Sequence, residues 1–218
     1  MGLYHLQFKK LRIILAWVGA AVLVYYSRSS ALSFLIGVPV VLAGEAVRLW
    51  ASGYIERKGA KLATDGPFAY VRNPLYVGNF LMGLGIVIIS QSPVMLVLFL
   101  AGFAFIYRGT VKKEEKDLEA LFGEPYRQYL KQVHPFIPRL SPYPGREKTS
   151  FQGALILKHR EYVTLLSLPA LISGLYLWQR VVVEKRFALN QQIALAVALI
   201  FFVALVFEKI FRNKLKPS

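Results

Sequence analysis

Residues Asp65–Gly85 read DGPFAYVRNPLYVGNFLMGLG, and within them a polar, cationic approach gives way to an apolar helix. Proline suits the first turn of a helix and asparagine is a good N-cap, so we expect a helix to begin at Pro74, directly after Asn73. The free N–H groups and the positive dipole end of that helix would lie beside Arg72. This arrangement predicts a site for a carboxylate or a phosphate, although Arg72 could instead only mark the cytoplasmic end of a membrane span.

The composition is that of an integral membrane protein. Of the 218 residues, 56% are hydrophobic, and they come in runs rather than in amphipathic stripes. We therefore expect an all-α, polytopic helical bundle with about six transmembrane helices. The six apolar runs are Leu11–Tyr26, Ala31–Ala51, Pro74–Ile89, Pro93–Tyr107, Tyr162–Trp178 and Gln191–Phe211.

The net charge of +15 follows the sides of a membrane rather than a nucleic-acid surface. Connections rich in lysine and arginine alternate with poor ones, which predicts that both termini are cytoplasmic and that Tyr54–Arg72 and Arg108–Arg160 share the cytoplasmic face. The loop with Arg180, Lys185 and Arg186 fits this alternation least well. We expect a bacterial or archaeal inner membrane, or the endoplasmic reticulum of a eukaryote, and no nucleic-acid partner.

Cysteine and histidine usage limits the chemistry. The chain has no cysteine, which excludes disulfides and thiolate nucleophiles. Its three histidines, His5, His134 and His159, are far apart in the sequence, so we expect no metal site.

The second apolar run carries two ionisable residues near its cytoplasmic end. Glu45 and Arg48 stand three residues apart on one helix face, where they can pair. Ionisable residues inside a span are functional candidates, although a pair close to the interface can also be purely structural. In the same run, Gly37 and Gly44 lie one heptad apart and could let a neighbouring helix approach closely.

The third run presents Tyr76 and Asn79 on one helix face, near the membrane surface. A tight turn at Ser90–Pro93 then brings the fourth run straight back. Arg108, at the end of that run, should therefore return to the membrane face at which Arg72 lies.

A separate amphipathic helix is expected at Val111–Phe122. Its lysines lie opposite an apolar stripe, whereas Glu114 and Glu115 fall on or beside that stripe. A second short helix follows, in which Tyr126 and Tyr129 share a face. The carboxylates and phenols should thus point back at the bundle, unless this cytoplasmic helix simply lies on lipid.

The remainder of the chain divides into a stiff passage and a membrane hairpin. The prolines between His134 and Pro144 exclude a continuous helix. Phe151–Ser218 is typical of two more spans with a polar lead-in at Lys158–Glu161, and a scaffold or dimerisation role is expected. We therefore divide the chain into a membrane core, 1–150, and an additional C-terminal hairpin, 151–218.

A series of motifs follows in order along about Gly44–Leu140. They are Arg48-Leu49-Trp50-Ala51, Gly66-Pro67-Phe68, Arg72-Asn73-Pro74-Leu75-Tyr76-Val77-Gly78, Glu114-Glu115, Leu118, Phe122-Gly123, Tyr126, Tyr129 and Ile137-Pro138-Arg139. In this order and spacing they resemble the isoprenylcysteine carboxyl methyltransferase and phospholipid methyltransferase family of membrane enzymes. The carboxyl-methylating branch commonly has histidine where this chain has Asn73, and Asn-Pro also occurs on the lipid-methylating side, so the substrate stays open.

The resemblance implies that S-adenosylmethionine binds between the start of the third run and the cytoplasmic helix that bears the glutamates. The implied cofactor-binding residues are Arg72, Asn73, Pro74, Tyr76 and Gly78 for its carboxylate, Glu114 or Glu115 for its ammonium or ribose, and Tyr126 and Tyr129 to close over it. The catalytic candidates are Arg72, Arg108 and Glu114. The candidates for holding the acceptor are Arg48, Glu45 and Asn79.

The implied reaction is methyl transfer to a membrane-associated amphiphile, either an isoprenylcysteine-like carboxylate or a lipid headgroup amine. The expected partners are the lipid bilayer and this lipid-like or prenylated acceptor, and the oligomeric state stays open. Two other functions remain as alternatives: a sterol-reductase-like enzyme that uses NADPH, against which the paired glutamates argue, and a non-catalytic membrane interaction protein.

Overall fold

The computed structural model describes residues 25–55, 61–186 and 189–214, with side chains up to residue 205. Nearly all of the first apolar run and both chain ends lie outside these residues. Among the described residues there are helices and no strands. The elements are α2 (Ala31–Ser52), the 3₁₀-helix η1 (Gly66–Ala69), α3 (Pro74–Ser90), α4 (Pro93–Phe122), α5 (Glu124–Gln132), α6 (Gly153–His159), α7 (Tyr162–Leu177), the π-helix η2 (Trp178–Val183) and α8 (Leu189–Lys214).

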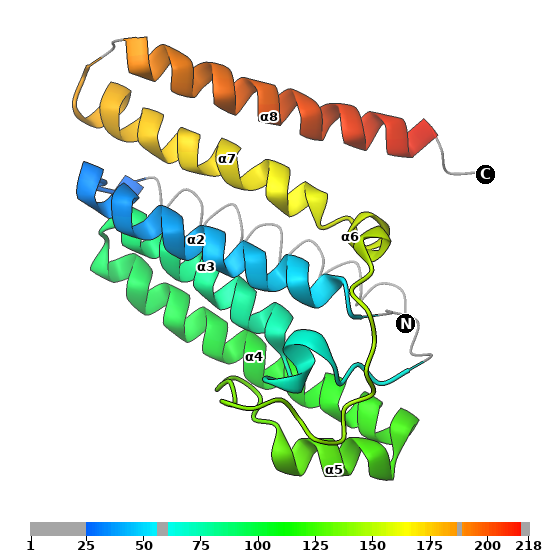
Figure 1. The fold of residues 1–218 in the computed structure, drawn as a ribbon. Coiled ribbons are helices and arrows are strands. Elements are labelled where there is room, and N and C mark those ends of the chain that lie inside the picture. Colours follow the sequence, from blue (N-terminus) through cyan, green and yellow to red (C-terminus); the bar gives the residue numbers. More distant parts are fainter. Residues whose placement is uncertain (1–24, 56–60, 187–188, 215–218) are drawn as a thin grey trace, which may run out of the picture.

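The long helices form a bundle with α2 near its centre (Figure 1). Helices α3 and α4 follow α2 on one side, and α7 and then α8 lie on its other side. The short α5 packs at the C-terminal end of α4. This arrangement gathers the start of α3, the end of α4 and α5 at one end of the bundle.

Glycines bring α2 and α3 into close antiparallel contact. A Cβ atom added to Gly44 would lie 2.6 Å from the carbonyl oxygen of Gly78, and one added to Gly37 would lie 2.7 Å from that of Gly85. Because the reverse contacts are equally close, each glycine pair leaves no room for a side chain. The close approach predicted from the heptad spacing of Gly37 and Gly44 is confirmed.

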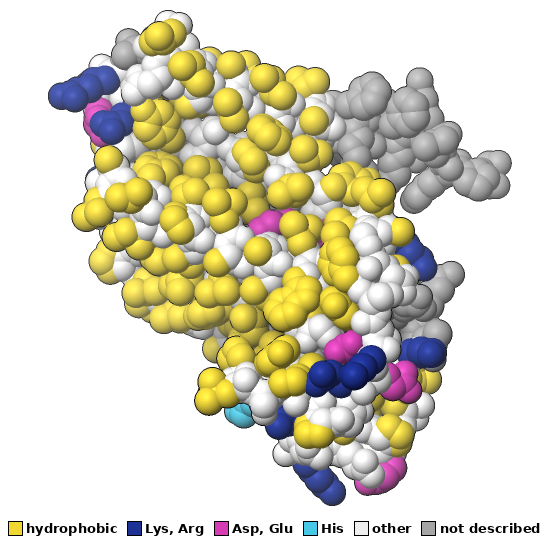
Figure 2. All heavy atoms as spheres, viewed as in Figure 1, with side chains coloured by type: hydrophobic (Ala, Val, Ile, Leu, Met, Phe, Trp, Pro, Cys, Tyr) yellow, Lys and Arg dark blue, Asp and Glu magenta, His cyan; other side chains and the backbone are white. Residues whose placement is uncertain are grey.

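Three of the described helices are long and apolar enough to cross a membrane, namely Ala31–Ser52, Pro93–Phe122 and Tyr162–Val183. Two shorter apolar helices span Pro74–Ser90 and Leu189–Leu205. Figure 2 shows hydrophobic side chains over most of the face formed by α2, α4, α7 and α8, with most of the charged side chains toward its two ends and an acidic side chain near its middle. The all-α membrane bundle is confirmed, whereas the number of six spans stays a prediction.

Helix α4 corrects the expectation of two separate helices in this region. The apolar run and the amphipathic segment form one continuous helix, Pro93–Phe122, of 30 residues, which spans roughly 45 Å. The side chain of Ser92 caps its start, and Gly123, with φ 60°, ends it. No glycine or proline signal stops the helix near Arg108, because Gly109 alone costs only about 1 kcal/mol in a helix. The carboxylates are therefore carried rigidly on a membrane helix.

An extended strap, residues 133–152, fixes the end of the bundle at which α3 starts. Its backbone N–H groups donate to the segment that leads into α3. The N–H of Arg139 donates to the carbonyl of Tyr70 at 2.9 Å, and the N–H of Tyr143 donates to the carbonyl of Ala69 at 2.8 Å. Farther along, Gln152 donates to the carbonyl of Gly53 at 2.9 Å. The strap contains no helix, as its prolines predicted, and it holds the approach to α3 in place.

Candidate functional site

A cavity of about 650 Å³ opens where α2, α3, α4 and α5 meet. This volume is typical of a cofactor site. Its lining residues come from all four helices and from the loop before α3: Arg48, Ile55, Lys61, Leu62, Ala63, Phe68, Arg72, Asn73, Leu75, Tyr76, Asn79, Glu114, Asp117, Leu118, Phe122, Tyr126 and Tyr129. The structure thus brings together most of the residues singled out in the sequence.

The start of α3 forms one wall of the cavity. Pro74 occupies the first turn and Asn73 is the N-cap residue, as expected. However, the Asn73 side chain makes no capping hydrogen bond, which corrects one detail of the prediction. Its Nδ2 instead donates to the carbonyl of Pro135 at 3.4 Å, and the backbone N–H of Arg72 donates to that of His134 at 3.0 Å. The strap therefore takes up the Asn73 side chain, while the backbone N–H groups of Tyr76 and Val77 donate to the carbonyl of Asn73 at 3.0 and 3.1 Å.

Glu114 and Glu115, two neighbouring carboxylates of α4, have different partners. Glu114 lines the cavity and accepts a hydrogen bond from the Tyr76 hydroxyl at 3.1 Å. Glu115 is not a lining residue, and its carboxylate lies 3.3 Å from the guanidinium of Arg72. These two contacts, Tyr76–Glu114 and Arg72–Glu115, join α4 to the start of α3.

Helix α5 supplies two buried tyrosines. Tyr126 and Tyr129 line the cavity and pack with Val133, Ala69 and Tyr143 in one apolar cluster. Tyr129 donates its hydroxyl to the carbonyl of Phe68 at 2.6 Å, which ties α5 to the loop before α3. Burial, together with the nearby Glu115, raises the pKa of Tyr126 to about 12, so its phenol stays a neutral hydrogen-bond donor at physiological pH.

At the inner end of the cavity, the predicted pairing of Glu45 with Arg48 is wrong. The guanidinium of Arg48 instead donates to Asn79 through one nitrogen and pairs with Glu161 through another. Glu45 is only 2% exposed, and neither of its carboxylate oxygens has a hydrogen-bond partner among the described residues. The i,i+3 rule failed because a carboxylate from α7, distant in sequence, reaches the guanidinium.

Five of the expected site residues do not line the cavity, namely Glu45, Pro74, Gly78, Arg108 and Glu115. Arg108 is exposed on α4 and does not line the cavity. Gly78 is buried in the α2–α3 contact, where a Cβ would lie 2.6 Å from a side-chain carbon of Arg48. Their catalytic and cofactor-binding roles stay predictions.

Sequence reasoning passed over two carboxylates near the cavity. Asp117 lines it one helical turn after Glu114, a spacing that the sequence shows. Glu161 reaches the inner end through Arg48, and the only signal for it was an acidic residue directly before an apolar run.

The donor set of the cavity fits S-adenosylmethionine. Among the described residues, the buried Nε of Arg72 has no hydrogen-bond partner, so this guanidinium can still bind a carboxylate. Glu114 and Asp117 offer negative charge for an ammonium group, and apolar and aromatic side chains such as Leu118, Phe122 and Tyr126 can pack on an adenine ring.

Comparisons with known proteins match the part of the chain that forms most of this cavity. Residues 44–125 match the model of the phospholipid methyltransferase family. The chain is 33% identical over 140 residues to the cobalt-zinc-cadmium resistance protein CzcN of Cupriavidus metallidurans. This alignment covers 62% of this chain and 64% of that protein. It is 39% identical over 77 residues to the protein-S-isoprenylcysteine O-methyltransferase of Schizosaccharomyces pombe, or 35% of this chain and 33% of that one.

A third relative is the methanethiol S-methyltransferase of Crocosphaera subtropica, which is 39% identical over 90 residues, or 40% of this chain and 31% of that protein. The chain thus spans less than two thirds of CzcN and about a third of the two methyltransferases. The matched segment contains the start of α3 together with Glu114 and Glu115, which carried the resemblance in the sequence. Residues 44–125 are therefore similar to the phospholipid methyltransferase family, and parts of the chain are similar to an isoprenylcysteine O-methyltransferase and a methanethiol S-methyltransferase.

Proposed function

We propose that this chain is an S-adenosylmethionine-dependent methyltransferase that acts on a membrane-associated amphiphile. The observation that carries the proposal is one cavity of about 650 Å³ in which Arg72, Glu114 and two buried tyrosines converge from three separate elements. The similarity of residues 44–125 to the phospholipid methyltransferase family model supports the same activity, since the similar proteins include methyltransferases.

The outer part of the cavity is the cofactor end in this proposal. Arg72 and the positive dipole end at the start of α3 would hold the cofactor carboxylate, and Glu114 would hold its ammonium group. Glu115 would act indirectly, because its carboxylate pairs with Arg72 and so keeps the guanidinium beside the cavity. Tyr126 and Phe122 would cover the adenosine part and keep water out.

The inner part is the acceptor end. Asn79 lies about one helical turn beyond Tyr76 along α3, and with Arg48 it lines the cavity on the side toward the apolar bundle. A lipid-soluble acceptor would arrive from this side, and Arg48 and Asn79 would orient its polar group.

When bound, S-adenosylmethionine supplies an electrophilic methyl group, so the chain needs no nucleophile of its own. Its residues contribute by aligning donor and acceptor in a pocket from which water is excluded, which lowers the barrier by several kcal/mol, on the order of 5. The acceptor atom is an oxygen, a nitrogen or a sulfur. The named relatives methylate an isoprenylcysteine and methanethiol, so both belong among the acceptors tested.

Cofactor binding to the full chain in one detergent tests the proposal first. Isothermal titration with S-adenosylmethionine should show saturable binding, and NADPH should show none. Transfer of labelled methyl is then measured into a total lipid extract, an S-prenylated cysteine and an alkylthiol, with product identification by mass spectrometry. Binding of NADPH without S-adenosylmethionine would favour a reductase, and binding of neither would favour a non-catalytic protein.

A further inference from the structure

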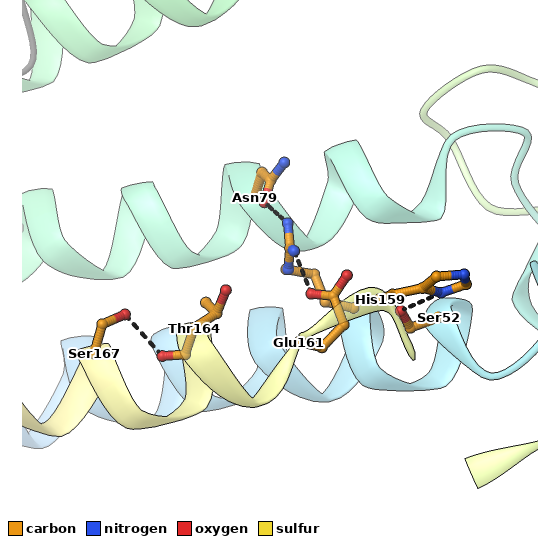
Figure 3. Close-up of polar contacts among 7 residues, drawn as sticks. Ser52, Asn79, His159, Glu161, Thr164 and Ser167 are labelled. Atoms are coloured by element: carbon orange, nitrogen blue, oxygen red, sulfur yellow. Dashed lines mark hydrogen bonds and ion pairs between the residues drawn. The ribbon is translucent and has the colours of Figure 1, made fainter. Parts of the chain in front are cut away.

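A polar cluster joins the C-terminal hairpin to the inner wall of the cavity (Figure 3). Glu161, at the start of α7, pairs with the guanidinium of Arg48 on α2, and the same guanidinium donates to Asn79 on α3. Arg48 and Asn79 line the cavity, whereas Glu161 stands behind them. Glu161 lies outside residues 44–125, the segment that matches the family.

The backbone holds Glu161 at this point from both sides. Arg160, with φ 61°, adopts the left-handed conformation that ends α6 and turns the chain toward α7. The N–H of Glu161 donates to the carbonyl of Ile156 at 3.0 Å, and its own carbonyl accepts from the N–H of Thr164 at 3.0 Å. A left-handed arginine is an uncommon conformation, and here it places the following carboxylate against α2.

The ion pair between Glu161 and Arg48 is buried, so its loss would have a large energetic cost. The Glu161 side chain is 2% exposed and that of Arg48 is 16% exposed. Removing one member of a buried ion pair leaves an uncompensated charge in apolar surroundings. The two terminal nitrogens of the guanidinium, one bound to Asn79 and the other to Glu161, also fix the direction in which the Arg48 side chain points.

Glu45 offers Arg48 another partner. It stands three residues before Arg48 on the same helix, is fully buried and has no hydrogen-bond partner among the described residues. Without the Glu161 carboxylate, the guanidinium would therefore turn toward Glu45 and leave the position that Asn79 and Glu161 define.

We propose that Glu161 is a positioning residue for methyl transfer, which holds Arg48 at the acceptor end of the cavity. The C-terminal hairpin is then part of the acceptor site rather than only a scaffold. This inference rests on the proposed function, and it adds a residue that acts on the acceptor through Arg48 and leaves the cofactor end untouched.

The test uses the full chain with whichever of the S-prenylated cysteine, the alkylthiol or the lipid extract the wild type methylates. Glu161→Gln should raise the apparent KM for that acceptor about tenfold or more, while the dissociation constant of S-adenosylmethionine changes less than about twofold. Glu161→Asp keeps the charge and should retain part of the affinity. Glu184→Gln, which removes the partner of Arg180 on the same hairpin, is the matched control and should change neither constant.

A double-mutant cycle separates positioning from folding. If Glu161 acts through Arg48, the variant Arg48→Gln with Glu161→Gln should show no larger acceptor defect than Arg48→Gln alone. Additive defects, or a fall in thermal stability with an unchanged acceptor KM, would overturn the inference and leave the proposed function standing. Absence of cofactor binding and methyl transfer in the wild type would remove the proposed function, and the inference with it.

Discussion

Arg72 connects the loop before α3 to both the strap and α4. Its backbone N–H is held by the strap through His134, and its guanidinium lies 3.3 Å from Glu115. Its side chain is only 12% exposed, and its Nε has no hydrogen-bond partner among the residues that the structure describes. A role as a mere marker of membrane topology would require neither this burial nor the ion pair with Glu115.

Replacement of Arg72 by alanine should weaken binding of S-adenosylmethionine by about 1.5–3 kcal/mol, or roughly ten- to a hundredfold. The physical reason is the loss of a charge-assisted contact to the cofactor carboxylate. Isothermal titration of the variant measures the change, and circular dichroism checks that the helices persist. An unaltered dissociation constant would leave Arg72 as a topology marker.

We expect opposite effects on cofactor affinity from replacing the carboxylates and the lysines of α4. Glu114→Gln should lower cofactor affinity and methyl transfer together by about tenfold or more, because the cofactor ammonium loses its charge partner. Glu115→Gln should have a smaller effect, since Glu115 contacts Arg72 and does not line the cavity. Titration of S-adenosylmethionine at one ionic strength compares the variants.

Lys112 and Lys116 provide the control, because both are exposed on the other side of α4. Their replacement by glutamine should alter the dependence on anionic lipid and leave cofactor affinity nearly unchanged, since exposed charges are screened. Equal, small and salt-sensitive effects from all these variants would mean that the glutamates face the lipid surface.

Among the elements, the α2–α3 pair positions the inner wall of the cavity. Gly44→Ala should lower the thermal unfolding temperature by several degrees, because the new Cβ would lie 2.6 Å from a backbone oxygen and overpacking costs about 1–3 kcal/mol. Gly102→Ala on α4 is the matched control, since nothing lies within 4 Å of its added Cβ. That variant should be neutral or slightly stabilised. Equal changes in both variants would show that close packing of α2 on α3 is not what the glycines provide.

Local signals in the sequence predicted these elements well. Pro74 marked the start of α3, the heptad spacing of Gly37 and Gly44 predicted the close helix pair, and the tyrosines of α5 were assigned to one face. Each of these signals acts within one or two helical turns. What failed was the choice of partners across the bundle, because Glu161 is 113 residues from Arg48 and no local rule connects them.

The prediction of the extent of α4 was wrong for a different reason. The change from apolar to charged residues near Arg108 suggested two helices, but it marks where one helix leaves the apolar layer. Composition reports the surroundings of a helix, whereas only a strong breaker reports its end. The same continuity explains how α4 can carry Glu114 to the start of α3 without a flexible joint.

At the scale of the whole molecule, the cavity requires that two distant segments share one end of the bundle. The structure brings them together: the N–H of Glu147 donates to the hydroxyl of Thr64 at 3.0 Å, and that of Thr149 donates to Asp65 at 2.7 Å. The charge pattern of the sequence predicted the same shared face and assigned it to the cytoplasm. The contacts support the shared face, while the side of the membrane stays a prediction.

Single cysteines at Lys61, Lys148 and Glu184 test that topology, since the chain has no cysteine to give a background. An impermeant thiol reagent should label Glu184→Cys in intact cells, and it should label Lys61→Cys and Lys148→Cys only after lysis. If Lys61→Cys and Lys148→Cys were labelled from outside and Glu184→Cys were not, the orientation in the membrane would be the reverse of the predicted one, but the two segments would still share a face. Labelling of Lys61→Cys and Lys148→Cys from opposite sides would separate the strap from the loop before α3. The cavity could not then form, because its wall depends on the hydrogen bonds between those two segments.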